Sequence, residues 1–109
     1  MKRIASIQDV SCLGRCSQTV ALPVVSAMGV ECAILPTAVL STHTSFPDFH
    51  CLDLTDQLLP VARHWKAQGV RFDALYTGYL ASDRQVAVVL ELLELLREEG
   101  TLLFVDPAM

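Results

Sequence analysis

The sequence predicts an α/β protein built on a mostly parallel sheet. Short apolar stretches typical of buried strands alternate along the 109 residues with longer stretches of helical periodicity. Three of the five glycines, Gly29, Gly69 and Gly100, follow the expected helices, where a helix end favours glycine. Strands that alternate with helices of this length form a parallel sheet with right-handed crossovers.

Four strands are expected, at Lys2–Ile7, Glu31–Val39, Asp73–Tyr79 and Thr101–Val105. Each is short and rich in apolar or β-branched residues, as buried strands are. Pro36 has no N–H to donate and disrupts the far half of the second strand. We therefore expect that strand to lie at an edge or to leave the sheet there.

Two helices are expected before the third strand. Ser17 caps the first, which runs to about Met28 and has a proline inside it. Thr55 caps the second, which runs to about Gln68, with Pro60 just after its first turn. Between the second strand and this helix, Leu40–Leu54 is a long polar connection, and loops of this length in a small domain are usually functional.

The third helix has the clearest signals. Ser82 and Gln85 have the spacing of a capping box, and Gly100 ends the helix. Its polar residues form a narrow stripe, and the remainder is apolar on most sides. We expect such a helix to be covered by more than one neighbour, either a sheet with helices or a partner chain.

Composition excludes several classes of protein. Apolar residues make up 52% of the chain and charged residues 18%, so the chain folds around a core. The net charge of −4 gives no electrostatic basis for binding nucleic acid or a membrane surface. No apolar stretch is long enough to span a bilayer, and Gln8 and Asp9 interrupt the start too early for a signal peptide. A cytoplasmic location is expected.

The four cysteines are expected to be thiols, as is usual in the cytoplasm. A zinc site could recruit Cys12, Cys16 and Cys51 with His43 or His50, but this spacing fits no compact zinc ribbon. We therefore expect small apolar thiols in or near the core.

Polar residues follow each predicted strand, where open α/β sheets bind ligands. Asp9 either accepts a hydrogen bond from a ligand or acts as a turn carboxylate. The hydroxyls of Thr42–Ser45 are more often bonded to their own backbone than to a ligand. Tyr79 either stacks on a flat ligand or packs, and Asp106 either binds a metal or phosphate or caps a turn. No GxxxxGK[ST], GxGxxG or GxSxG motif is present.

Four segments, IQDVSCLGRCS, PTAVLSTHT, TGYLAS and VDPAM, resemble the successive motifs of pyridoxal kinases in the ribokinase superfamily. The resemblance is greatest to the bacterial pyridoxamine and pyridoxine kinases. Kinases of hydroxymethylpyrimidine look less similar, because their first loop has a GSD-SGGAG pattern that this chain lacks. The resemblance implies a three-layer α/β/α ribokinase-like (Rossmann-like) fold with a mostly parallel, incomplete sheet, in which residues 1–109 are the amino-terminal part of one kinase domain.

The resemblance also implies an activity and roles for five residues. Family members transfer the γ-phosphoryl group of ATP, with Mg²⁺, to the 5′-hydroxyl of a B6 vitamer. Asp9 matches a position where many of them have a serine that contacts substituents of the pyridine ring. Thr44 and Ser45 match substrate contacts, and Tyr79 matches an aromatic residue against the ring. Asp106 matches an aspartate on the side of the nucleotide phosphates.

The last motif stops at DPAM where the family pattern is DPVMGD, and the GTGD-type segment with the catalytic base does not occur. We therefore expect a vitamer-binding face without complete catalytic machinery, and a homodimer for the complete protein. Two alternatives remain open. One is a kinase of the same fold for another hydroxymethyl heterocycle or a sugar. The other is a non-catalytic half-domain that binds a vitamer or pairs with a partner chain.

Overall fold

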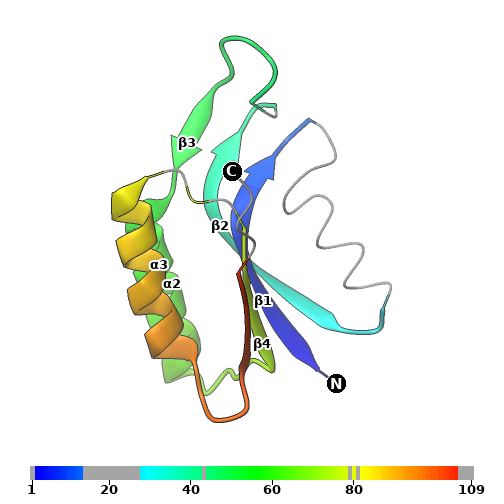
Figure 1. Ribbon diagram of the computed structural model, residues 1–109, viewed down its shortest axis with the longest axis vertical. Helices are drawn as coiled ribbons and strands as arrows, with labels where there is room; N and C mark the ends of the chain where they lie inside the picture. Colours follow the sequence, from blue (N-terminus) through cyan, green and yellow to red (C-terminus); the bar gives the residue numbers. More distant parts are fainter. Residues whose placement is uncertain (1, 14–27, 43, 79, 81, 106–109) are drawn as a thin grey trace.

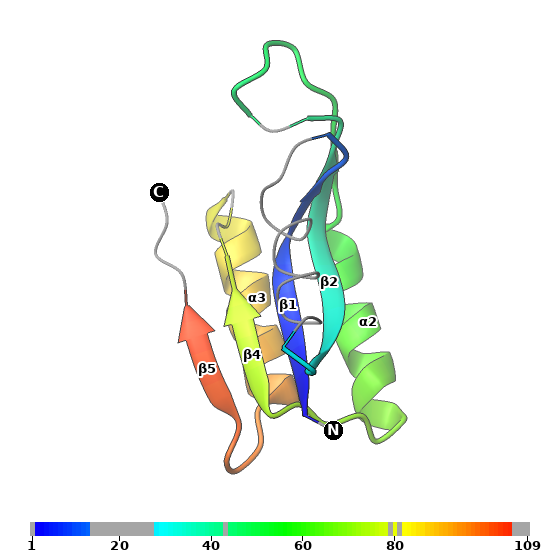
Figure 2. The ribbon, with the colours of Figure 1, turned by 90° about the vertical axis from the view of Figure 1, so that its right-hand side faces the viewer.

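The structure, a computed structural model, describes residues 2–13, 28–42, 44–78, 80 and 82–105. These form a five-stranded sheet of order β3-β2-β1-β4-β5, with two helices packed side by side on one face (Figures 1 and 2). The elements are β1 (Arg3–Ser11), β2 (Glu31–Leu40), β3 (Cys51–Asp53), α2 (Thr55–Ala67), β4 (Ala74–Thr77), α3 (Asp83–Leu96) and β5 (Leu102–Val105). The predicted helix at residues 17–28 lies outside the described residues except for Met28.

The predicted fold class is confirmed. Strand β1 pairs in parallel with β2 and β4, and β4 pairs in parallel with β5. Strand β3 was not predicted, because it lies within the connection Leu40–Leu54. It pairs antiparallel with β2 through Cys51–Asp53, a segment too short to show an alternating pattern.

The register of β1 and β2 shifts beside Pro36. Gln8 pairs with Pro36, but Val10 pairs with Val39, so β2 has one extra residue at this point. The pairing of β3 with β2 covers residues 38–40, after the proline. The prediction of an edge therefore holds for the part of β2 that contains Pro36, whereas the strand itself continues to Leu40.

The core lies between the sheet and the two helices. Its largest fully buried side chains include Ile7 of β1, Leu58 of α2, Leu75 of β4 and Leu92 of α3. All four belong to one cluster, which also contains Leu35 of β2. Both helices and three of the parallel strands therefore share a single core. None of the described helices is both long and apolar enough to cross a membrane.

Helix α2 begins differently from the prediction. Thr55 is its first residue rather than its cap, and Leu54 is the cap position, with no capping side chain. The carboxylate of Asp53 instead accepts hydrogen bonds from the Thr55 N–H (2.7 Å) and the Thr55 hydroxyl. Pro60 lies inside the helix, which continues to Ala67.

Helix α3 confirms its predicted start. The Ser82 hydroxyl oxygen accepts from the Gln85 N–H at 3.1 Å. The helix ends at Leu96, however, and Gly100, with φ of 86°, lies in the turn before β5. One side of α3 packs against α2 and the sheet as expected, while Val86 and Leu90 are exposed.

Candidate ligand-binding edge of the sheet

The carboxyl ends of β1, β2 and β4 lie at one edge of the sheet, together with the amino ends of α2 and α3 (Figure 1). In a parallel α/β sheet this edge is where ligands bind. The sequence places its candidate residues along this edge, and the structure describes three of the five: Asp9, Thr44 and Ser45. Tyr79 and Asp106 lie outside the described residues.

Asp9 lies inside β1 rather than in a corner after it, because the strand continues to Ser11. It is opposite the extra residue of β2, at the step between the Gln8 and Val10 pairs. The side chain is half-buried, and its carboxylate has no hydrogen-bond or ion-pair partner in the described part of the chain. The position of Asp9 within the strand does not fit a turn carboxylate, and its half-buried carboxylate is open to water or to a ligand.

Gln8 is a residue of this edge that sequence analysis did not single out. Its side chain is buried, and its Nε2 donates to the Ser6 hydroxyl at 3.1 Å. Gly78, directly after β4, donates its N–H to the Ile7 carbonyl at 3.1 Å. A Cβ at Gly78 would lie 2.8 Å from Cγ and Oε1 of Gln8. The close approach of β1 and β4 explains why residue 78 is a glycine. In the sequence, the signal that could have drawn attention to Gln8 was its polar side chain at the end of an apolar run.

Thr44 and Ser45 belong to a hairpin arm, residues 41–53, that projects beyond the ends of the neighbouring strands (Figure 1). Ser41 and His50 close the arm: the Ser41 N–H donates to the His50 carbonyl, and the His50 N–H donates to the Ser41 hydroxyl, each at 2.8 Å. Both predicted contact residues are exposed. The arm brings them to the same edge as Asp9, although no hydrogen bond links them to its carboxylate.

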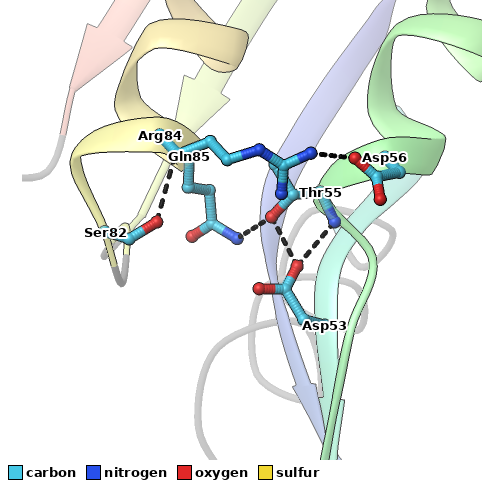
Figure 3. Close-up of polar contacts among 6 residues, drawn as sticks. All are labelled: Asp53, Thr55, Asp56, Ser82, Arg84 and Gln85. Carbon is cyan, nitrogen blue, oxygen red and sulfur yellow. Dashed lines mark hydrogen bonds and ion pairs between the residues drawn. The ribbon is translucent and has the colours of Figure 1, made fainter.

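A polar cluster joins the base of this arm to both helices (Figure 3). Thr55 and Gln85 are buried, and the Gln85 Nε2 donates to the Thr55 hydroxyl oxygen at 3.2 Å. The hydrogen bonds from Thr55 lower the pKa of the Asp53 carboxyl, burial opposes this shift, and the positive charge of Arg84 adds to it. Arg84 forms an ion pair with Asp56, which connects the first turns of α2 and α3.

The cysteines differ from the prediction of core thiols. Cys12 and Cys51 are exposed, and Cys32 is half-buried, with a pKa raised by desolvation. Within the described ranges, no three His, Cys, Asp or Glu side chains gather in a way that could hold a metal ion. Cys16 and His43, which the alternative zinc site would use, lie outside those ranges.

A hollow of about 490 Å³ lies at the opposite edge of the sheet, where β1 and β4 begin. Several of its charged groups have partners: Arg71 contacts Glu98 at 3.5 Å, the Asp73 carboxylate accepts from the Arg3 N–H at 2.8 Å, and the Arg3 side chain contacts Glu31, outside the lining, at 3.0 Å. The hollow is therefore a salt-bridged surface at the amino ends of the strands, away from the predicted ligand edge.

No family model and no curated protein matches the chain. Solved structures do match it. A putative phosphomethylpyrimidine kinase from Bacteroides thetaiotaomicron is 46% identical over 97% of this chain, with a TM-score of 0.93. Its orthorhombic crystal form, with pyridoxal, gives 45% identity over 99% of the chain. Pyridoxal kinase from Lactobacillus plantarum is 35% identical over 100% of the chain, with a TM-score of 0.87.

The chain belongs to the family of pyridoxal and phosphomethylpyrimidine kinases. It spans 37% to 39% of the length of these proteins and matches an amino-terminal portion of the family fold. Pyridoxal kinase from Leishmania donovani, solved in complex with ADP, has a TM-score of 0.81 at 23% identity, a likeness that extends to the fold alone. The ribokinase-like α/β fold predicted from the four motifs is thus confirmed.

Proposed function

We propose that the chain is the amino-terminal part of a B6-vitamer kinase, which transfers the γ-phosphoryl group of ATP to the 5′-hydroxyl of pyridoxal, pyridoxine or pyridoxamine. The observation that carries the proposal is the half-buried Asp9 carboxylate at the carboxyl end of the central strand, which lacks a described partner. The sequence of the chain is 45% identical to that of a putative kinase crystallised with pyridoxal. A vitamer ring that carries a hydroxyl or an ammonium substituent supplies the hydrogen-bond donor that this carboxylate lacks.

The roles of the site residues follow from this proposal. Asp9 accepts a hydrogen bond from a ring substituent, and Thr44 and Ser45 contact the substrate from the hairpin arm. Tyr79 lies against the ring and Asp106 lies near the nucleotide phosphates, as the family resemblance implies. The Mg²⁺ that neutralises phosphate charge in such transfers binds mainly to the nucleotide itself.

Phosphoryl transfer also needs a group that accepts the proton of the substrate hydroxyl. The family motif that carries this base does not occur in residues 1–109. We infer that these residues contribute substrate binding within a single kinase domain, and that the base comes from another part of the complete protein. The complete kinase is expected to be a cytoplasmic homodimer.

A second candidate is a kinase for a hydroxymethylpyrimidine. One specific observation favours it, namely that the 46% identical relative is described as a putative phosphomethylpyrimidine kinase. The same relative was crystallised with pyridoxal, so the relative itself does not separate the two substrates. Both heterocycles carry a hydroxymethyl group, and the choice between them depends on which ring substituents Asp9 and the hairpin arm accept.

The test is a substrate panel. The complete reading frame that contains this chain is expressed and assayed with ATP and Mg²⁺ against pyridoxal, pyridoxine, pyridoxamine and hydroxymethylpyrimidine, with residues 1–109 alone as the control. We expect turnover of at least one vitamer by the complete protein and none by the control. A complete protein that phosphorylates only the pyrimidine would replace the first candidate by the second, and one that phosphorylates none of the four would exclude both.

A further inference from the structure

Gln85 contacts more of the structure than a capping residue needs to. Its backbone N–H is bonded to Ser82, as its position in the first turn of α3 predicts. Its side-chain Nε2 donates to the Thr55 hydroxyl oxygen of α2 at 3.2 Å (Figure 3). The same Nε2 donates to the Thr37 carbonyl of β2 at 3.3 Å. The residue is 2% exposed, so these bonds are shielded from water.

The two acceptors flank the hairpin arm and the short stretch of β2 that leads into it. Thr37 lies in β2 where the register with β1 shifts, directly before the part of β2 that pairs with β3. Thr55 is the first residue of α2, two positions after the arm ends. A single side chain on a third element therefore ties together the place where the arm leaves the sheet and the place where it returns.

Two further bonds close the same base. The Leu54 N–H donates to the Thr37 carbonyl at 3.0 Å, so that carbonyl accepts from both Leu54 and Gln85. The Thr55 hydroxyl donates to Asp53, the last residue of β3, while it accepts from Gln85. The outer part of the arm is exposed and is closed by the Ser41–His50 bonds. The base of the arm thus has several hydrogen bonds, and two of them come from the buried side chain of Gln85.

We propose that Gln85 is a positioning residue, which holds the base of the hairpin arm so that Thr44 and Ser45 meet the ligand at the carboxyl edge of the sheet. The ligand part of this inference rests on the proposed function. The positioning part depends only on the contacts at the base. Gln85 does not itself touch the substrate in this account, and it acts through Thr37 and Thr55.

Amide hydrogen exchange on this chain tests the positioning. Gln85→Met keeps the volume of the side chain and removes both donated bonds. We expect exchange at the Leu54 and Ser41 amides to rise about tenfold relative to the Gly78 amide, since a buried hydrogen bond changes an equilibrium by roughly this factor. Gln57→Met, an exposed change on α2, should leave all three amides unchanged.

Val89→Ala controls for general loss of stability, because it removes a buried side chain one turn further along α3. It should raise exchange at all three amides alike. Thr55→Val removes the other end of the bridge and should reproduce the selective pattern if Gln85→Met does not fold. The positioning role would be overturned if the Gln85 and Thr55 variants raised exchange equally at the Leu54, Ser41 and Gly78 amides. It would also be overturned if exchange at Leu54 and Ser41 did not change.

The ligand part is tested in the complete kinase. Gln85→Met should raise the KM for the vitamer about tenfold and change kcat by less than about twofold, while Val89→Ala should leave KM unchanged. A fall in kcat at constant KM would contradict positioning of the substrate. If the unmutated complete protein phosphorylates no vitamer, the proposed function fails, whereas the positioning role is still decided by the exchange measurement.

Discussion

Strands β1 and β5 belong to the same sheet and differ in how their residues are covered. β1 contains Ser6, Gln8 and Asp9 among its nine residues, yet it is buried over most of its length. β5 is Leu-Leu-Phe-Val, and all four of its side chains are exposed, from 38% for Leu103 to 62% for Val105. The more apolar strand is thus the more exposed one.

Position in the sheet explains the difference. β1 is central, with β2 on one side and β4 on the other, while β5 is at the edge and, among the described residues, pairs only with β4. An exposed apolar edge strand is a surface on which another strand or chain can pair. The sequence reveals that each segment is a strand, but the cover that each receives depends on neighbours that are distant along the chain.

The largest effect expected from this contrast is in the core beside β5. Leu75 of β4 pairs in register with Leu103 of β5, so two leucines in adjacent strands differ mainly in burial. Leu75→Ala should destabilise the chain by roughly 2–5 kcal/mol, because it removes buried methyl groups and leaves a cavity in the core. Leu103→Ala should cost less than about 1 kcal/mol, because exposed positions contribute little. Urea unfolding of both variants measures this, and equal costs would contradict the burial contrast.

A second prediction concerns the tight packing of β1. Gly78→Ala would bring a Cβ within 2.8 Å of the buried Gln8 side chain, and overpacking of this kind costs roughly 1–3 kcal/mol. Gln8→Ala removes the clashing atoms, so adding Gly78→Ala to it should cost much less than it does alone. Thermal or urea unfolding of the two single variants and the double variant gives the coupling. Additive effects would mean that Gln8 is not what makes Gly78 necessary.

The exposed edge strand β5 predicts that copies of the chain associate with one another. We expect changes in β5 to affect this association more than the stability of the fold. Leu102 and Phe104 lie two positions apart in β5, and the exposed fractions of these residues are 59% and 51%. We expect the chain to bind an apolar dye and to associate in size-exclusion chromatography. Phe104→Lys should reduce both, because a charge on an edge strand opposes pairing with another strand. A sharply melting monomer that binds no dye would show that β5 needs no further cover.

The smallest expected effect is at Asp53. Hydrogen bonds from Thr55 lower the pKa of its carboxyl, so it is charged in the folded chain at a pH where it would begin to be protonated when unfolded. Its contribution to stability is complete above the pKa of the unfolded carboxyl and is lost as the pH falls through the lower pKa of the folded state. Asp53→Asn should therefore cost under about 1 kcal/mol at neutral pH, since exposed groups are screened, and nothing in strong acid. A cost that does not change with pH would exclude this charge effect.

Among the described elements, the sequence predicted the two helices and the four parallel strands, whose residues show a helical or an apolar pattern of their own. It did not predict β3, because three exposed residues have no pattern of their own and become a strand only by pairing with β2. It assigned the cap of α2 to Thr55, because hydroxyl and carboxyl residues near a helix start are similar signals in a sequence. Only the fold shows that Leu54 is at the cap position and that Asp53, one residue before it, accepts the Thr55 N–H.

For the candidate site, the sequence predicted an edge of the sheet and five residues. Asp9, Thr44 and Ser45 are described and lie toward that edge, Tyr79 and Asp106 lie outside the described residues, and the roles of all five as ligand contacts stay predictions. The role of Gln85 could not be predicted, since it depends on contacts between distant elements, and for Gln8 the sequence offered only a polar residue at the end of an apolar run. Gln85 was assigned to a cap by its spacing from Ser82, whereas its side chain reaches Thr37, 48 positions away. Long-range bonds of this kind leave no local pattern in the sequence.

We expect Asp9 to bind the vitamer near the carboxyl end of β1, and steady-state kinetics of Asp9→Ala in the complete kinase decide this. A lost charge-assisted hydrogen bond costs roughly 1.5–3 kcal/mol, so we expect KM to rise by about one to two orders of magnitude with a smaller change in kcat. Pyridoxamine should lose most, because its cationic amine forms an ion pair with the carboxylate that the pyridoxine hydroxyl does not. Unchanged KM values with a collapsed kcat would contradict the account and place Asp9 in the chemical step.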